Sequence, residues 1–539
     1  MGEKAGNIKS IMEKKKLQIW LPLLLSISMI IGMFFGFKMR DGLPGKSFFY
    51  KETRRPLQEV LDIISRKYVD SVDLEKLSDT AIIALLHQLD PHSSFIPAED
   101  LDMVNEDING NFFGVGIEYN IFFDTMHVVN VFKDGPAFKA GIRIGDKILK
   151  AGDSSYVGKK LTGELIRKTL RGPLGSPVVL SVFREGKKID IKIDRGIIPI
   201  YSMEASYMIN PTTGFIRLNK FTKQTYREFM EALTSLKKQG LQKLILDIRG
   251  NGGGVMDEAV EIADEFLPGD KLITYTEGLH NKKKEYRCRR QGQFETGALV
   301  LLADEGSASA SEILLGALQD WDRATIIGRR SFGKGLVQEQ FNLTDRSALR
   351  LTVARYYTPV GRSIQRSYAN GDKAYFAEVT NRYTDGSMLT ADSIKNDSSR
   401  IYSTQGGKKI FGGGGISPDY FIAADTGRLD TTTTKLYYKG LLSDFGYLYI
   451  LKNPGTAGSF KNADQFTRDF NFSDADWNYF SQLVAKDSID ISRISEKEKI
   501  FLRKTLKASI ARQLYRTEGY YEVMNADDKA VMKALELLK

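Results

Sequence analysis

The chain has almost none of the residues on which disulfide frameworks and metal sites depend. Cys288 is the only cysteine among 539 residues, so no disulfide can form within one molecule. The four histidines have no spacing typical of metal ligands, which argues against a metallopeptidase. Cys288 lies in a basic, polar stretch without a helix signal, so a cysteine nucleophile is disfavoured. We therefore expect no metal and no other cofactor.

An excess of charge is missing too. The net charge of +10 is small for this length, and the basic residues are scattered. The sequence has neither a nucleic-acid recognition motif nor a basic helix with interleaved aromatic residues, so we expect no nucleic-acid partner. An apolar content of 42% and a charged content of 27% are ordinary for a globular protein, and 539 residues suggest three or four folded units.

One apolar stretch, residues 17–37, departs from this ordinary composition because it contains no charged side chain. At a rise of about 1.5 Å per residue, it is long enough to cross a bilayer as a helix. The lysines at 14–16 favour a cytoplasmic tail at 1–16, and the lack of an A-x-A-like cleavage site argues against a signal peptide. We expect a retained, single-pass signal anchor in the cytoplasmic (inner) membrane, with the catalytic part on the periplasmic side.

Residues 304–338 combine a helix start rich in small and hydroxyl residues with an isolated lysine between glycines. Ser309 and Glu312 have the spacing of a capping box, and a serine at a helix N-terminus lies beside free N–H groups that can stabilise an oxyanion. Lys334 can take the proton of such a serine if burial keeps the lysine neutral. The pair is therefore a candidate catalytic site. The alternative is that Ser309 is only a cap and Lys334 is solvated.

The stretch Gly328–Lys334 also matches the first seven positions of a phosphate-binding loop. Gly335 stands where such a loop needs serine or threonine to bind magnesium. Residues 336–341 alternate like a strand where the loop needs a helix. The sequence therefore argues against a nucleotide site.

Several separated motifs resemble the carboxy-terminal processing (tail-specific) serine peptidases. They are EGSASASE around Ser309, FGKG at Lys334 with Gln338 after it, a DIRGNGGG segment at 247–254, and LTVARYYTPVGRSIQ at 351–365. The resemblance implies that Ser309 is the nucleophile, that Lys334 is the general base, and that Gln338 orients the lysine.

Residues 196–425 alternate strands and helices, which predicts an α/β core with parallel strands covered by helices, and the resemblance implies a ClpP/crotonase-like core. The glycine-rich turn and the serine loop both follow strands, where functional loops of such sheets lie. We expect the N–H groups of Ala310 and of Gly253, or its neighbour Gly254, to form the oxyanion hole. The family often has proline in place of Gly252, so we expect a less rigid turn here.

Residues 107–195 are β-rich with two short helices, and GPAFKAGI at 135–142 resembles a landmark of PDZ domains. Such domains add the C-terminal strand of a substrate to a sheet edge and hold its carboxylate in a backbone nest. The resemblance implies a groove flanked by the helix at 162–170. It also implies a nest in the loop at 113–117, with four peptide-binding residues: Gly114, Val115, Gly116 and Ile117. The alternative is a PDZ fold used only for packing.

The flanking regions carry less chemistry. Residues 47–106 are predicted to be helical, and His92 lies in an Asp-Pro-His-Ser turn, where we expect a structural role. In the C-terminal region, 426–539, residues 431–434 resemble a polar linker and 474–538 are predicted to be mostly helical. The alternatives for this region are a partner-binding or gating module and a packing appendage.

Together these features predict a multidomain α+β protein: a membrane-anchored serine endopeptidase acting outside the cytoplasm on protein or peptide substrates with free C-termini. One alternative is a catalytically inactive PDZ scaffold that binds C-terminal peptides. Another is an acyl-transfer or hydratase-like enzyme on the same kind of core. A homo-oligomer and an accessory regulator stay open as partners.

Overall fold

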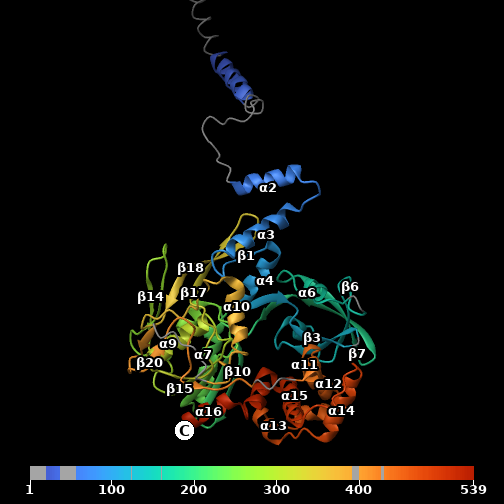
Figure 1. Cartoon of the computed structure of the whole chain (residues 1–539). Coiled ribbons are helices and arrows are strands. Elements are labelled where there is room, and N and C mark those ends of the chain that lie inside the picture. The colour runs from blue at the N-terminus through green and yellow to red at the C-terminus, as the bar shows by residue number, and fades with distance from the viewer. Residues whose placement is uncertain (1–19, 37–55, 123, 159–160, 391–399, 426–429) are drawn as a thin grey trace, which may run out of the picture. The chain divides into compact units, whose positions relative to one another are not determined.

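The computed structural model describes six stretches of the chain, which are residues 20–36, 56–122, 124–158, 161–390, 400–425 and 430–539 (Figure 1). The contacts divide the chain into two units, 1–78 and 79–539. The first unit contains an exposed helix at 20–36 and α2 (Pro56–Lys67), and α3 (Leu74–Leu86) begins in it.

The predicted tail at 1–16 and both ends of the predicted span at 17–37 lie outside the described residues. Among the helices that the structure describes, none is both long and apolar enough to span a bilayer.

After the end of α3 and β1 (Ser94–Ile96), the second unit contains α4 (Ala98–Asn109) and a small β domain of antiparallel strands in the order β3-β4-β5-β7-β8. Burial alternates along β7, where Val178, Leu180 and Val182 face the core, as expected for a strand with one covered face. A separate pair, β2 and β9, closes the domain at its ends, and β6 pairs with β5. These elements match the predicted PDZ region: β2 (Asn111–Gly114), β3 (Ile117–Phe122), β4 (Thr125–Val131), α5 (Pro136–Lys139), β5 (Lys147–Ala151), β6 (Ser154–Ser155), α6 (Gly163–Leu170), β7 (Pro177–Arg184), β8 (Lys187–Asp194) and β9 (Gly196–Pro199).

The α/β core is built on a six-stranded sheet in the order β10-β11-β12-β15-β16-β21, parallel except for β10. Leu244 and Leu246 of β12 pack under the helices α7, α8 and α9, whereas Ile245 between them faces the other side. The elements are β10 (Met203–Asn210), β11 (Thr213–Leu218), α7 (Thr225–Lys238), β12 (Lys243–Asp247), α8 (Met256–Asp264), β15 (Ala298–Ala303), α9 (Ala310–Asp320), β16 (Thr325–Gly328) and β21 (Tyr420–Phe421).

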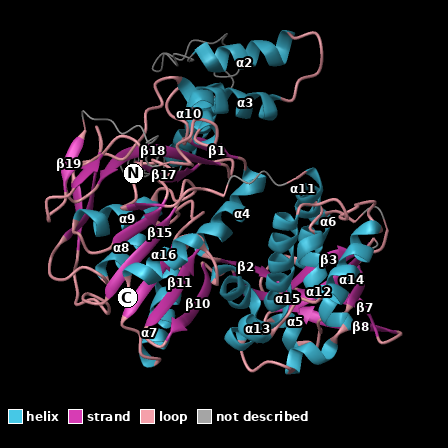
Figure 2. Ribbon diagram, turned by 60° about the horizontal axis from the view of Figure 1, so that its bottom comes forward, coloured by secondary structure: helices cyan, strands magenta, loops and turns pink. Residues whose placement is uncertain are grey.

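The last helix, α16 (Lys529–Leu537), covers the second face of this sheet (Figure 2). Its buried residues Ala530, Val531 and Ala534 pack with Ile245 and Val300 of the sheet. The C-terminal region is therefore part of the core in its final helix, and the core extends beyond the predicted boundary at residue 425.

A second sheet contains the strand that follows Lys334. Its strands have the order β1-β18-β13-β14, with β17 paired to β18 in antiparallel fashion. The predicted extended run at 336–341 is β17. The bounds are β1 (Ser94–Ile96), β13 (Leu272–Glu277), β14 (Lys284–Arg287), β17 (Leu336–Asn342) and β18 (Ala348–Tyr357), followed by α10 (Gly371–Asn381), β19 (Ile401–Ser403) and β20 (Lys409–Phe411).

The helical C-terminal region has a core of its own, which includes Phe445, Phe480 and Leu506. The prediction of a linker at 431–434 is wrong, because Asp430 caps a helix there by accepting the Thr433 N–H at 2.6 Å. The elements are α11 (Thr431–Tyr438), α12 (Leu441–Lys452), a 3₁₀ turn (Pro454–Gly458), α13 (Ala463–Asp469), α14 (Asp474–Ala485) and α15 (Glu496–Asn525).

Candidate active site

Strand β15 delivers the chain to Ser309, which stands immediately before α9 in a strained conformation with φ 55° and ψ −114°. A positive φ is uncommon for a residue other than glycine and is held only when the surroundings enforce it. The predicted capping box is present, since Glu312 Oε2 accepts the Ser309 N–H at 2.9 Å. All of α9 is buried, so the serine is fixed at the end of a rigid element.

The glycine-rich turn lies directly against this serine. A Cβ on Gly253 would stand 2.8 Å from Ser309 Cβ and 3.0 Å from Ala310 N. A Cβ on Gly254 would stand 2.0 Å from the Phe221 carbonyl oxygen, and both glycines have positive φ. Only glycine fits at these two positions.

The predicted oxyanion donors differ in whether their N–H groups already have an acceptor. The Gly253 N–H already donates to Asn251 Oδ1 at 2.9 Å, so an oxyanion role for it requires that amide to move. Among the described residues, no acceptor engages the N–H of Ala310 or of Gly254. Gly254, which the sequence left as the alternative to Gly253, is therefore the better candidate partner of Ala310.

The side-chain amide of Gln338 positions Lys334. Lys334 Nζ donates to Gln338 Oε1 at 2.8 Å, which is the contact expected of an orienting glutamine. Gln338 Nε2 donates in turn to the backbone carbonyl of His92. The turn around His92 therefore fixes the glutamine that fixes the lysine, a relationship between residues 246 positions apart that no local pattern indicates.

Burial, and after it the nearby positive charge of Arg350, lower the pKa of Lys334 to about 8, whereas Asp90 and Glu312 act in the opposite direction. At pH 8 about half of such lysines are neutral and able to accept a proton. The neutral amine that a lysine base needs is thus well populated from about pH 8 upward.

Glu312 and Tyr356 tie the two sides together. The Glu312 carboxylate is fully buried and accepts from Ser331 Oγ (2.5 Å), Gly333 N (2.6 Å) and Lys334 N (2.9 Å), besides Ser309 N. Burial raises the pKa of the Glu312 carboxyl, and the four donors oppose that rise. The Tyr356 hydroxyl lies 3.1 Å from the Ser309 carbonyl oxygen and 2.9 Å from that of Lys334.

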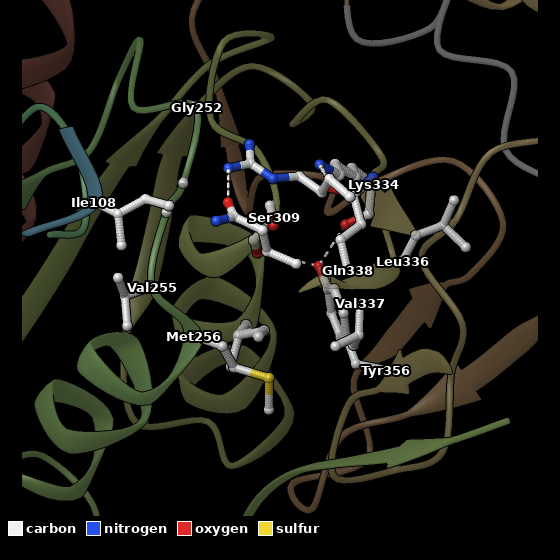
Figure 3. A pocket seen from close by; sticks show the side chains of 15 residues that line it. Ile108, Gly252, Val255, Met256, Ser309, Lys334, Leu336, Val337, Gln338 and Tyr356 are labelled. Carbon is white, nitrogen blue, oxygen red and sulfur yellow. Dashed lines mark hydrogen bonds between the residues drawn. The ribbon is translucent and has the colours of Figure 1, made fainter. Parts of the chain in front are cut away.

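Ser309, Lys334 and Gln338 lie around one cavity of about 510 Å³ (Figure 3). Its walls combine apolar and polar groups, and the glycine-rich turn forms one side. No hydrogen bond joins Ser309 Oγ to Lys334 Nζ in the described structure, and such contacts are often long before substrate binds. The structure thus brings the predicted residues into one site, while their catalytic roles stay predictions.

Other candidate side chains lie outside this cavity. His92 Nε2 pairs with the Tyr375 hydroxyl at 2.9 Å, and burial lowers its pKa to about 4, which agrees with a structural role for a neutral imidazole. Burial raises the pKa of Cys288 to about 12, so this thiol is a poor nucleophile. Within the described part of the chain, no three His, Cys, Asp or Glu side chains converge on a metal position.

A second cavity of about 420 Å³ lies in the β-rich domain beside α6. Val115, Gly116 and Ile117 of the predicted nest line it, together with Ile166 of the helix, whereas Gly114 does not. Its position, between this loop and α6, matches the predicted peptide groove.

Three family models match separate parts of the chain. The family model described as peptidase family S41 matches residues 212–373, a PDZ domain model matches 101–194, and a family of unknown function matches 432–516.

Two curated relatives and one solved structure illustrate the similarity. A carboxy-terminal-processing protease of Bartonella bacilliformis is 37% identical over 59% of this chain and 73% of its own. A probable CtpA-like serine protease of Staphylococcus epidermidis is 34% identical over 59% of this chain and 65% of its own length. A solved photosystem II D1 C-terminal processing protease is 27% identical, covers 72% of this chain and 89% of its own, and has a TM-score of 0.35.

Proposed function

The chain belongs to peptidase family S41, the carboxy-terminal-processing serine proteases, and on that premise we propose that it is a membrane-anchored endopeptidase with a Ser309–Lys334 catalytic pair. The single observation that carries the proposal is the Lys334 Nζ–Gln338 Oε1 bond in the cavity that Ser309 also lines. A neutral amine that donates one N–H to Gln338 keeps its lone pair for the serine proton.

In this mechanism Lys334 takes the Ser309 Oγ proton as that oxygen bonds to the scissile carbonyl carbon. The carbonyl oxygen gains the electron pair and is stabilised by the N–H groups of Ala310 and of Gly254 or Gly253. The C–N bond then breaks, and the amine leaves with the proton from Lys334. Water hydrolyses the resulting ester, with Lys334 again acting as base.

The β-rich domain supplies the selection of substrates in this proposal. A tail adds a strand beside α6, and its carboxylate lies in the loop at 113–117, of which Val115, Gly116 and Ile117 line the second cavity. The anchor rests on the uncharged run at 17–37 behind the lysines at 14–16, and it places the rest of the chain outside the cytoplasm.

The proposal is tested with the detergent-solubilised full chain and an unstructured peptide that has a free apolar C-terminus. We expect cleavage by the wild-type protein and none by Ser309→Ala. Binding without cleavage by both proteins would support the inactive scaffold instead. Neither binding nor cleavage would support an enzyme that acts on small molecules.

A further inference from the structure

The catalytic cavity has an unbalanced charge. Fifteen residues line it, and they include two basic side chains, Lys334 and Arg350, but no carboxylate. The remaining lining residues are apolar side chains, backbone of the glycine-rich turn, two glutamines, Ser309 and Tyr356. A substrate group that carries negative charge would therefore find a complementary surface beside the nucleophile.

Arg350 is the cation that the mechanism does not use. It lies on β18 opposite Ser94 of β1 and Gln340 of β17, and its side chain is half-buried. Within the described chain its guanidinium makes one hydrogen bond, a long one of 3.4 Å from Nη2 to Gln340 Oε1, and no ion pair. Four of its five N–H donors have no acceptor in the described structure.

Three other shielded arginines in the same core are paired with carboxylates, whereas Arg323 donates to the backbone carbonyls of Phe266 and Phe294. Arg217 and Arg249 both bind Asp247, at 2.8 and 2.7 Å, and Arg362 binds Asp320 at 2.7 Å. Removing a charge from water is unfavourable unless a partner compensates it, and these contacts supply that partner. Arg350 is thus a partly desolvated cation that faces a cavity without its counter-ion.

The neighbouring amide is fixed in the orientation that such a cation needs. Gln340 Nε2 donates to Asn105 Oδ1 at 3.2 Å and to Asn342 Oδ1 at 3.3 Å, so its Oε1 is turned toward Arg350. This arrangement holds the guanidinium without neutralising it. The cation is preorganised for an anion that the chain itself does not provide.

We propose that Arg350 binds a carboxylate beside the scissile bond, so that the serine site prefers substrate tails with an acidic group next to the cut. A guanidinium fork fits a carboxylate with two parallel hydrogen bonds. The carboxylate comes from an aspartate or glutamate side chain, or from the free C-terminus when the cut lies close to it. This inference rests on the proposed protease function.

The same contact has a consequence for the base. The positive charge of Arg350 helps to keep Lys334 neutral, so a bound carboxylate that offsets this charge raises the pKa of Lys334. An acidic substrate should therefore be cleaved with an acid limb at higher pH than its neutral counterpart. A merely structural Arg350 would give one limb for both substrates.

The test uses the full chain and quenched peptides that share one C-terminal tail, in which a single glutamate, glutamine or lysine is moved through an otherwise neutral sequence. Cut sites are identified by mass spectrometry, and rates are compared at pH 9. For the wild-type protein we expect kcat/KM to be roughly tenfold to a hundredfold higher for glutamate than for glutamine at one position beside the cut. The ratio should fall to about one in Arg350→Gln and persist in part in Arg350→Lys.

A second arm separates the two sources of carboxylate. Amidation of the C-terminus is compared in wild-type protein and Arg350→Gln, for peptides cut near their end. An amidation effect that disappears with Arg350→Gln assigns the terminal carboxylate to Arg350, and one that persists assigns it to the PDZ groove.

Three outcomes are distinguishable. Equal cleavage of glutamate and glutamine peptides by the wild-type protein overturns the inference without relying on any variant. A ratio retained in Arg350→Gln also overturns it. If the protease function itself is wrong, no peptide is cut, and the wild-type protein behaves like Ser309→Ala.

Discussion

The backbone N–H groups of Ser309 and Lys334 donate to the same carboxylate oxygen, Oε2 of Glu312, at 2.9 Å each. Ser309 follows a strand of the parallel sheet and Lys334 lies in the turn before β17, so this oxygen sets the spacing of two separate structural elements. Chemistry of this kind loses about 100-fold in rate for a displacement near 1 Å.

Replacing Glu312 by glutamine should therefore lower kcat by roughly 100-fold with little change in KM, because an amide presents an N–H₂ group to some of the four donors. The matched control is Glu228→Gln, which alters another buried carboxylate that accepts from Ser202 and Met203, away from the serine cavity. Steady-state kinetics of both variants tests this prediction, after circular dichroism has verified that each variant is folded. Equal kcat losses in the two variants would refute a positioning role for Glu312.

The lowered pKa of Lys334 predicts the pH dependence of the reaction. Its amine is protonated below about pH 8 and neutral above it, so kcat/KM should rise with pH through about 8 and then level off. Lys334→Arg should be as inactive as Lys334→Ala, because arginine keeps its charge. An activity profile that is flat between pH 6 and 9 would exclude this lysine as the base.

The same shift predicts a stability change. Because the folded pKa is about 8 and the ordinary value is 10.5, the unfolded chain binds the extra proton between these values, and stability rises with pH across this window. Lys334→Met should therefore be more stable than the wild-type protein at pH 7, by roughly 3 kcal/mol, with the difference disappearing above pH 10.5. Denaturant titrations at several pH values measure it, and a gap that stays constant with pH would contradict it.

The catalytic candidates could be predicted from the sequence because each depends on its neighbours in the chain. Ser309 directly precedes a helix, and Gln338 lies four residues after Lys334. The PDZ groove lies between a glycine loop and a short helix. Their surroundings could not be predicted, because Glu312 binds the backbone of Gly333 and Lys334 from 21 and 22 residues away.

Long-range packing also explains the errors in the outer regions. A run of four threonines resembles a linker, but Asp430 starts a helix there whose Leu436 is fully buried in the C-terminal core. The final helix has an ordinary amphipathic pattern that does not indicate which sheet it covers. The Gly253 N–H likewise donates a hydrogen bond to Asn251 Oδ1, a local contact that depends on the folded shape of the turn.

The glycine-rich turn yields a paired prediction. Gly254→Ala should abolish activity and reduce folded yield, because its Cβ would stand 2.0 Å from the Phe221 carbonyl oxygen. Gly252→Ala, two residues earlier in the same turn, is the matched control. Nothing lies within 4 Å of the position that its Cβ would take, and its φ is not positive. We expect the control to retain full activity and to gain about 0.5 kcal/mol of stability, which thermal unfolding can measure. An active Gly254→Ala protein would remove this glycine from the site.

The proposed anchor predicts the topology of the chain in cells. Protease added outside the inner membrane should digest residues beyond about 40 while the tail at 1–16 stays protected, because lysines flank the apolar run on its cytoplasmic side. Immunoblotting with tags at both ends measures this. Digestion of the peptidase only after the cytoplasm is opened would reverse the topology.

Two substitutions at the contact between the PDZ domain and the C-terminal helices should change local amide hydrogen exchange in opposite directions. Phe122 stacks on Tyr447 with ring centroids 5.3 Å apart, and beside them Asn120 Nδ2 donates to Asp444 Oδ1 at 2.8 Å. Burial raises the pKa of Asp444 to about 6, while the Asn120 bond lowers it in part.

A carboxyl whose folded pKa is raised stabilises the fold only when protonated, so this contact should weaken as pH rises from about 4 through 6. Asp444→Asn keeps an oxygen for Asn120 and removes the charge, so at pH 7.5 it should slow amide hydrogen exchange in β3, β4 and α12 relative to the wild-type protein. Asn120→Ala should accelerate exchange there at pH 7.5, because the buried carboxylate loses its donor, and should have little effect at pH 4. Hydrogen exchange measured by mass spectrometry at both pH values reports the interface directly, whereas a global melting temperature would average several domains. Identical exchange in the wild-type protein and Asp444→Asn at pH 7.5 would show that the charge on Asp444 does not govern this contact.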